Sequence, residues 1–240
     1  MTWFDDWQDP GFARHWDAHS TRSNPIRDDL VDILVSSIEK GFRDGDVILD
    51  IGMGSGQLEA EIFGRLPRAR VVGVDNSKPM LDIAAERLAG FADRYSVVFQ
   101  DLTELSSVRL PHDSYQYVIT SQTLHELPHE AKQSVLKLGK SALAPGGLML
   151  IADRSNLHAT LLHDAYSAVW DIWMRRVPAE EQRDFQALLH GYLTKDDHPP
   201  TAGELLRWLE ELGLYGEPVF VQLNRFLIAA QHAGADNARS

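Results

Sequence analysis

One short stretch, Val47 to Gln57, constrains the fold of this chain more than any other. An apolar, β-branched run reaches Asp50 and then passes into three alternating glycines, Gly52, Gly54 and Gly56. This order is typical of a buried strand that passes into a helix across a ligand, because glycine accepts left-handed backbone angles and lets the chain approach a bound molecule. The helix that follows would direct its free N–H groups at that molecule. The stretch therefore predicts a ligand-binding turn.

A second apolar strand ends at an acid, Asp75, which lies 25 residues beyond Asp50. A carboxylate at such a strand end can accept hydrogen bonds from both ribose hydroxyls of an adenosine-containing ligand. Asn76 and a capping Ser77 then begin a helix. In that helix Met80 is expected either to lie against an adenine ring or to pack in the core.

Strands and helices alternate from about residue 45 to residue 153, which predicts a parallel sheet with helices on both faces. The third strand reaches Asp101 and Leu102, and the fourth gives way to Ser121. Ligands bind at the carboxyl ends of strands in open α/β sheets, so both strand ends are candidate site positions. Alternatively, Asp101 caps the turn that follows it.

Together these segments resemble the motifs of class I S-adenosyl-L-methionine-dependent methyltransferases. The matching segments are Asp50-x-Gly52-x-Gly54-x-Gly56, Gly73 to Ser77, Asp101-Leu102, Ser121 to Leu127 and Leu143 to Gly147. The resemblance implies a Rossmann-like, seven-stranded, mostly parallel sheet with helices on both faces. It also implies S-adenosyl-L-methionine as cofactor, S-adenosyl-L-homocysteine as product, no metal, and an adenine contact from Asp101. The cofactor residues expected from it are Asp50, Gly52, Gly54, Gly56, Asp75, Asn76, Met80, Asp101, Leu102 and Ser121.

Two helical segments are expected to cover the site. Residues 1–40 form an aromatic N-terminal lid, 41–153 the cofactor-binding core, 154–215 a helical insert, 216–232 the last two strands and 233–240 a frayed tail. Trp16, His19 and Arg22 from the lid and His158 from the insert are the expected substrate contacts. The alternative for the lid aromatics is packing onto the core.

The candidate general base is His125, which follows the fourth strand where a substrate would arrive. Its alternative role is structural, at the start of a helix. The histidines of the insert lie near acidic residues, but none has the spacing of a helical metal-ligand pair, so a metal site is not expected.

Composition limits the partners. The formal charge of −12 argues against a nucleic-acid partner, and the chain has no cysteine. No signal peptide or membrane-spanning run is recognised, so the protein is expected to be cytoplasmic, a monomer or a homodimer, and to act on a small molecule.

Two alternatives stay open. Arg22-Ser23-x-Pro25 and Asp75-Asn76-Ser77-x-x-Met80 are similar to segments of carboxy-S-adenosylmethionine synthases, which build a carboxylated cofactor used in tRNA modification. That activity needs a cation for the added carboxylate; Arg183 is the nearest candidate, and Met53 replaces a cysteine of that family. The other alternative is a non-catalytic methyltransferase-like binding protein. The acceptor, and whether its carbon, oxygen or nitrogen is methylated, stay undetermined.

Overall fold

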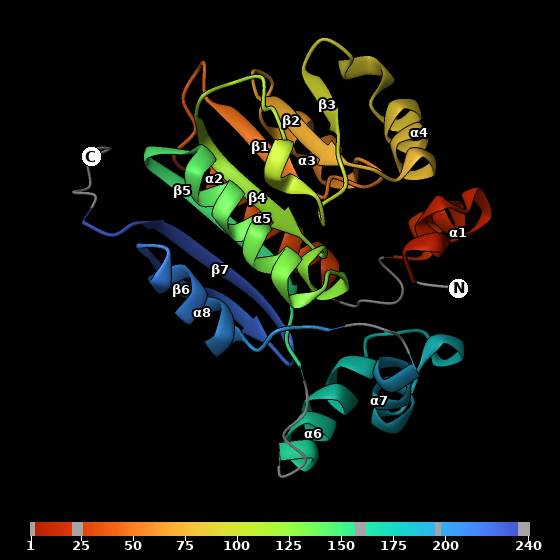
Figure 1. The fold of residues 1–240 in the computed structure, drawn as a ribbon. Helices are drawn as coiled ribbons and strands as arrows, with labels where there is room; N and C mark the ends of the chain where they lie inside the picture. The colour runs from red at the N-terminus through yellow and green to blue at the C-terminus, as the bar shows by residue number, and fades with distance from the viewer. Residues whose placement is uncertain (1–2, 21–25, 157–161, 195–197, 235–240) are drawn as a thin grey trace.

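The computed structural model describes residues 3–20, 26–156, 162–194 and 198–234. Seven strands form one sheet in the order β3-β2-β1-β4-β5-β7-β6 (Figure 1). They are β1 (Val47–Ile51), β2 (Arg70–Asp75), β3 (Tyr95–Phe99), β4 (Tyr115–Ser121), β5 (Leu143–Arg154), β6 (Leu214–Gln222) and β7 (Arg225–His232). The first five pair in parallel, whereas β7 is antiparallel to both β5 and β6. The predicted Rossmann-like, mostly parallel seven-stranded sheet is confirmed, and its strand order reverses between β1 and β4.

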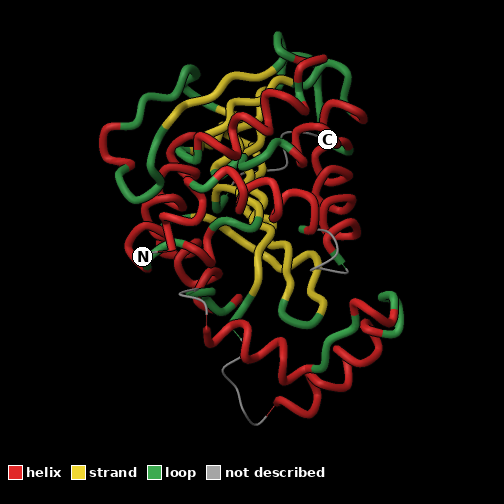
Figure 2. Tube along the Cα trace, turned by 90° about the vertical axis from the view of Figure 1, so that its right-hand side faces the viewer, coloured by secondary structure: helices red, strands yellow, loops and turns green. Residues whose placement is uncertain are grey.

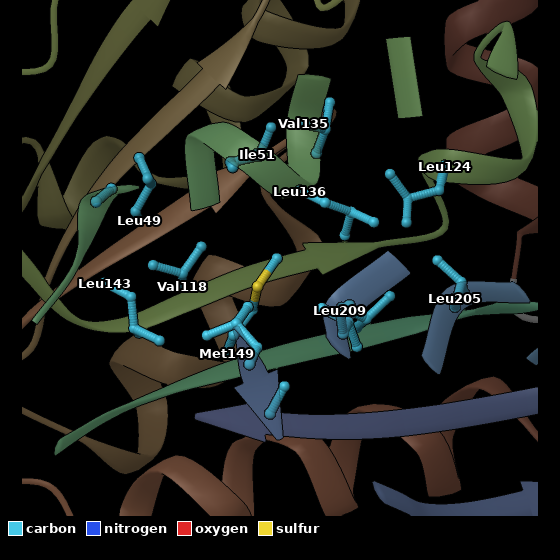
Figure 3. Close-up of a cluster of buried hydrophobic side chains, with 14 of the residues drawn as sticks. Leu49, Ile51, Val118, Leu124, Val135, Leu136, Leu143, Met149, Leu205 and Leu209 are labelled. Atoms are coloured by element: carbon cyan, nitrogen blue, oxygen red, sulfur yellow. The ribbon is translucent and has the colours of Figure 1, made fainter. Parts of the chain in front are cut away.

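Helices cover both faces of the sheet. One face packs against α2 (Arg27–Glu39), α3 (Gln57–Arg65) and α4 (Lys78–Arg87), and the other against α5 (His129–Ala142) and α8 (Ala202–Glu211). Along β1, Ile48 joins the first of these cores and Leu49 the second, which is drawn in Figure 3. Burial on both faces explains why the central strands are almost continuously apolar.

The N-terminal segment lies beside α4 at the edge of the site (Figure 1). It consists of the 3₁₀ helix η1 (Trp3–Gln8) and of α1 (Pro10–His19). The Asp9 side chain caps α1 by accepting the Phe12 N–H, at 2.6 Å, and Pro10 occupies the first turn, where it needs no donor. Ala13 of α1 packs with Met80 and Ile83 of α4, which holds the segment against the core.

The insert forms its own helical pair beyond the carboxyl ends of the strands (Figures 1 and 2). It contains α6 (His163–Met174) and α7 (Phe185–Thr194), joined through a short 3₁₀ turn, η6 (Ala179–Glu181). Three further 3₁₀ turns lie in the core: η2 (Ala89–Phe91), η3 (Leu105–Ser107) and η4 (Leu124–Glu126). A capping box begins α8, since the Thr201 and Glu204 side chains accept each other's backbone N–H groups.

In α6, Val169 and Ile172 are 37% and 51% exposed, because the helix buries its Trp170 and Trp173 side, together with Phe185 of α7. The fifth strand begins at Leu143, and its pairing with β4 shifts register between Tyr115 and Tyr117.

Within the part of the chain that the structure describes, no helix is both long and apolar enough to cross a membrane.

Candidate cofactor and substrate cleft

A cleft opens at the carboxyl ends of β1, β2 and β4, beside the point where the strand order reverses. Its empty volume, open solvent included, is about 970 Å³. The residues that line it are Trp7, Gln8, Trp16, Arg27, Asp50, Gly52, Met53, Gly54, Ser55, Gln57, Leu58, Asp75, Asn76, Ser77, Met80, Leu102, Ser121, Gln122, Thr123, Glu126 and Leu127.

The glycine turn forms the floor of the cleft. All three glycines have positive φ, 91° at Gly52, 55° at Gly54 and 74° at Gly56. A Cβ at Gly52 would lie 2.3 Å from the Thr123 hydroxyl, so the turn also needs glycine for space. Gly52 donates its N–H to the Val74 carbonyl at 2.8 Å, which ties the turn to β2. The predicted role of these glycines in shaping the turn thus has a visible steric basis.

Asp75 joins the glycine turn to the start of α4. Its Oδ2 accepts the Gly54 N–H and its Oδ1 accepts the Ser77 N–H, both at 2.8 Å. Burial raises the pKa of Asp75, and these backbone donors act against that rise by favouring the carboxylate. Each oxygen keeps a lone pair for a further donor, so the carboxylate can hold two ligand hydroxyls while it holds the turn.

Two buried polar atoms of the cleft wall make no hydrogen bond among the described residues. Asp50 is 1% exposed and its Oδ1 accepts no hydrogen bond, and the Gln122 Nε2 is buried without an acceptor. Gln122 also has a φ of 55°, a conformation that non-glycine residues rarely adopt outside functional sites. Orphaned polar atoms of this kind indicate that a ligand completes the site. The sequence analysis missed Gln122, although it lies next to Ser121 at the end of β4.

The N-terminal segment supplies an aromatic and cationic wall. The Trp7 and Trp16 rings meet edge to face, with centroids 5.4 Å apart, and the Arg27 guanidinium lies 5.4 Å from the Trp16 ring. Arg27 donates to the Gln57 side-chain oxygen at 2.8 Å, and no carboxylate among the described residues lies within ion-pair distance of it. A guanidinium on the cleft wall without a direct ion pair favours an anionic ligand group, although Asp28 and Asp17 lie close enough to act on its charge. The predicted substrate contact Arg22 lies outside the described residues, among which Arg27 is an arginine that lines the cleft.

Most of the predicted cofactor residues lie on the cleft. Gly56 does not line it, because the space beside its Cα is taken by Ala84 and Leu88 of α4. Asp101 does not line it either. Its Oδ1 accepts the backbone N–H and the hydroxyl of Thr103, at 2.8 and 2.7 Å, which is the turn-capping alternative.

Among the predicted substrate contacts, Trp16 lines the cleft. His19 is exposed and bonds the His15 carbonyl of its own helix, so the structure turns it away from the cleft. Arg22 and His158 lie outside the described residues.

His125 is placed behind the cleft wall rather than in it. It is 5% exposed, its Nδ1 lies 2.5 Å from Asp153 Oδ1, and its Nε2 lies 3.3 Å from Glu126 Oε1. Burial alone would lower the pKa of His125, but the Asp153 and Glu126 carboxylates together outweigh burial and raise it. With both ring nitrogens on carboxylates, His125 has no nitrogen open to a substrate, which corrects the expectation of a base at this position. Its backbone carbonyl instead accepts the His198 N–H at 2.8 Å, where the chain returns from the insert.

No group of three or more acidic or histidine side chains with the geometry of a metal site occurs among the residues that the structure describes.

A family model described as a methyltransferase domain matches residues 48–147, which include the glycine turn, Asp75 and the end of β4. The match spans less than half of the chain. Two curated relatives and a solved structure extend the similarity beyond the matched range.

The first relative is the carboxy-S-adenosyl-L-methionine synthase of Desulfotalea psychrophila, 24% identical over 68% of this chain and 70% of its own length. The second is the malonyl-[acyl-carrier protein] O-methyltransferase of Priestia megaterium, 28% identical over 65% of this chain. The alignment spans only 53% of that second relative. An O-methyltransferase family protein from Burkholderia thailandensis has the same fold, with a TM-score of 0.65 at 15% identity over 92% of this chain and 59% of its own.

Proposed function

We propose that this chain is a class I S-adenosylmethionine-dependent methyltransferase that transfers a methyl group to a small-molecule acceptor. The observation that carries the proposal is the position of Asp75. It is a largely buried carboxylate on the cleft whose two oxygens hold the glycine turn and the α4 start, and which can still accept two ligand hydroxyls.

The residues of the cleft fit this cofactor. Asp75 would hold the ribose hydroxyls, and Met80 and Leu102 offer apolar surface for an adenine ring. The partnerless Asp50 and Gln122 suit the polar, positively charged amino-acid end beside the glycine turn. When bound, S-adenosylmethionine supplies both the methyl group and its leaving group. The protein then has to align an acceptor and exclude water.

The described residues of the cleft are better suited to align a methyl acceptor than to remove a proton from it. Trp7 and Trp16 close one side of the cleft and would exclude water, and Arg27 can orient an acceptor or cofactor through an anionic group. His125 would act as a positioning residue that fixes the backbone of the adjacent Glu126 and Leu127, which do line the cleft. We further propose a cytoplasmic enzyme, monomeric or homodimeric, that needs no metal and has no nucleic-acid partner.

A carboxy-S-adenosylmethionine synthase-like activity is the second candidate. It is favoured by the name of the first relative and by a cation in the cleft, which that chemistry needs. That cation is Arg27. Arg183 is exposed and precedes α7, where its backbone carbonyl accepts the Trp170 N–H.

Mass spectrometry of reaction products separates these functions. The purified chain is incubated with S-adenosylmethionine and a panel of small carboxylic acids, phenols and amines. Formation of S-adenosylhomocysteine together with a methylated acceptor is the expected result. A carboxylated cofactor would instead support the synthase. Cofactor binding without either product across the panel would favour a binding protein, and absence of binding would contradict the proposal.

A further inference from the structure

Two carboxyl groups lie together beneath the glycine turn. Asp50 is at the end of β1 and Glu59 is in the first turn of α3, and they are 1% and 0% exposed. Within the described part of the chain, no side-chain donor reaches Asp50 Oδ1 or either oxygen of Glu59. A hydrogen bond between two carboxyl groups requires that one of them carries a proton. Two adjacent carboxylates without a donor would otherwise be strongly unfavourable in the interior.

The surrounding charges do not neutralise this pair. Asp75 from β2 adds negative potential, and the nearest cation is Arg87 from α4. The Arg87 guanidinium is engaged by Asp17 Oδ2, at 2.7 Å, and by the Ser55 carbonyl. Burial first, and then Glu59 and Asp75, hold the pKa of Asp50 well above its usual range, and burial also raises that of Glu59. The pair therefore retains one proton where isolated carboxyl groups have lost theirs.

Asp50 is the member of the pair that lines the cleft. Its carboxyl group lines the cleft, is almost fully buried and has an oxygen without a partner. A positive charge placed in the cleft would stabilise the doubly ionised pair in a low-dielectric surrounding, where such interactions are strong. Glu59 does not line the cleft and can act only through Asp50.

We propose that Asp50 and Glu59 share one proton and release it to solvent when a ligand of net positive charge occupies the cleft, so that the pair favours the methyl donor over its product, which keeps the ammonium and carboxylate groups but lacks the sulfonium. The inference rests on the proposed cofactor. The pair changes from one negative charge to two, and the sulfonium of S-adenosylmethionine supplies the compensating positive charge. The thioether of S-adenosylhomocysteine does not. Glu59 is then a specificity-determining residue that favours product release.

Calorimetry tests this directly. Titrations with S-adenosylmethionine and with S-adenosylhomocysteine are run in two buffers of different ionisation enthalpy, between about pH 6 and about pH 8. We expect about one more proton to be released with the donor than with the product. By linkage, the affinity ratio of donor to product then rises by up to about tenfold per pH unit while the pair retains its proton.

Glu59→Gln removes one carboxyl group at constant size, and it is expected to abolish the difference in proton release. Glu61→Gln is the matched control, because Glu61 is exposed on the same helix, and it should behave as wild type. If circular dichroism shows that Glu59→Gln does not fold, Asp50→Asn replaces it. The difference in proton release between the two ligands in the wild type is then the second measurement. Equal proton release for both ligands, or a difference that persists in Glu59→Gln, would overturn the inference. Absence of binding by either ligand would instead refute the proposed function.

Discussion

Gln122, in the cleft wall, has two energetically unfavourable features. Its φ of 55° is unfavourable for a side-chain-bearing residue, and its buried amide nitrogen has no acceptor in the protein. These features are expected to contribute little to stability, and we propose that the Gln122 amide donates a hydrogen bond to a ligand.

We therefore expect Gln122→Ala to lower the affinity for S-adenosylmethionine about tenfold, the loss of one hydrogen bond of roughly 1.4 kcal/mol, while the free energy of unfolding changes by less than about 1 kcal/mol. Calorimetric titration and urea denaturation measure the two quantities. Gln186→Ala, on an exposed position of α7, serves as control. A stability loss with unchanged affinity would show that Gln122 is structural.

The His125–Asp153 pair makes stability depend on pH. Because the folded pKa of His125 is raised above 6.5, the pair stabilises the protein fully below that pH and loses this contribution as the pH rises through the folded pKa. The pKa of Asp153 is lowered from 3.8, so its own contribution is lost only as the pH falls through that lower value.

The expected outcome is a free energy of unfolding that decreases above about pH 6.5 in the wild type. His125→Gln should flatten this part of the profile, whereas His19→Gln, an exposed histidine of α1, should leave it unchanged. Urea denaturation at a series of pH values gives the profile. An equal slope in wild type and His125→Gln would contradict the assignment.

Among the helices, α1 contacts the glycine turn and α4 chiefly through the carboxylate of Asp17. Asp17 Oδ1 accepts from the Ser55 hydroxyl at 2.5 Å and from the Gln57 amide at 2.7 Å, and Oδ2 accepts from Arg87. The Asp17 side chain is only 15% exposed. A second tie, Arg14 to Glu86 at 3.2 Å, joins the same two helices but is largely exposed.

This contrast predicts different effects for two acidic substitutions. Asp17→Ala should weaken the docking of α1 by about 1–3 kcal/mol and reduce cofactor affinity, because it removes several bonds to the glycine turn and α4. Glu86→Ala should change either quantity by less than about 0.5 kcal/mol, as exposed ion pairs do. Hydrogen exchange of residues 10–19 and calorimetric titration report both. Similar exchange in the two variants would contradict the assignment.

The elements of the core were predictable because their signals are local. β-branched runs that end at acids gave β1 and β2, and Ser77 and Thr201 marked helix starts through their capping side chains. The exposed apolar residues of α6 were not predictable, since apolar side chains cover most of that helix outside the side with Asp164 and Asp171, and the packing of α7 decides which of them are buried.

The same distinction applies to the site. Motif spacing could place Asp75 and the glycines at strand ends, but it could not show that Arg27 of α2 and Gln122, after β4, line one cleft, or that Glu59 of α3 is buried behind it. It also could not show that His125 points at Asp153, because that contact joins η4 to β5 through side-chain direction alone.

In the whole molecule, two segments flank the α/β core: the N-terminal segment, which lies against α4, and the α6–α7 pair, beyond the strand ends (Figure 1). The residues that line the cleft come from the core and from the N-terminal segment. We expect this shared cleft to bind S-adenosylmethionine through Asp75.

Calorimetric titration of the full chain with S-adenosylmethionine, compared with Asp75→Ala, tests that claim most directly. We expect one binding site per chain. Asp75→Ala should lose roughly 2–3 kcal/mol of binding free energy, about 30-fold to 150-fold in affinity, and should keep the circular dichroism spectrum of the wild type. Asp82→Ala, which removes an exposed ion pair with Lys78 on α4, should bind as wild type does. Unchanged affinity in Asp75→Ala, or no binding to the wild type, would contradict the account.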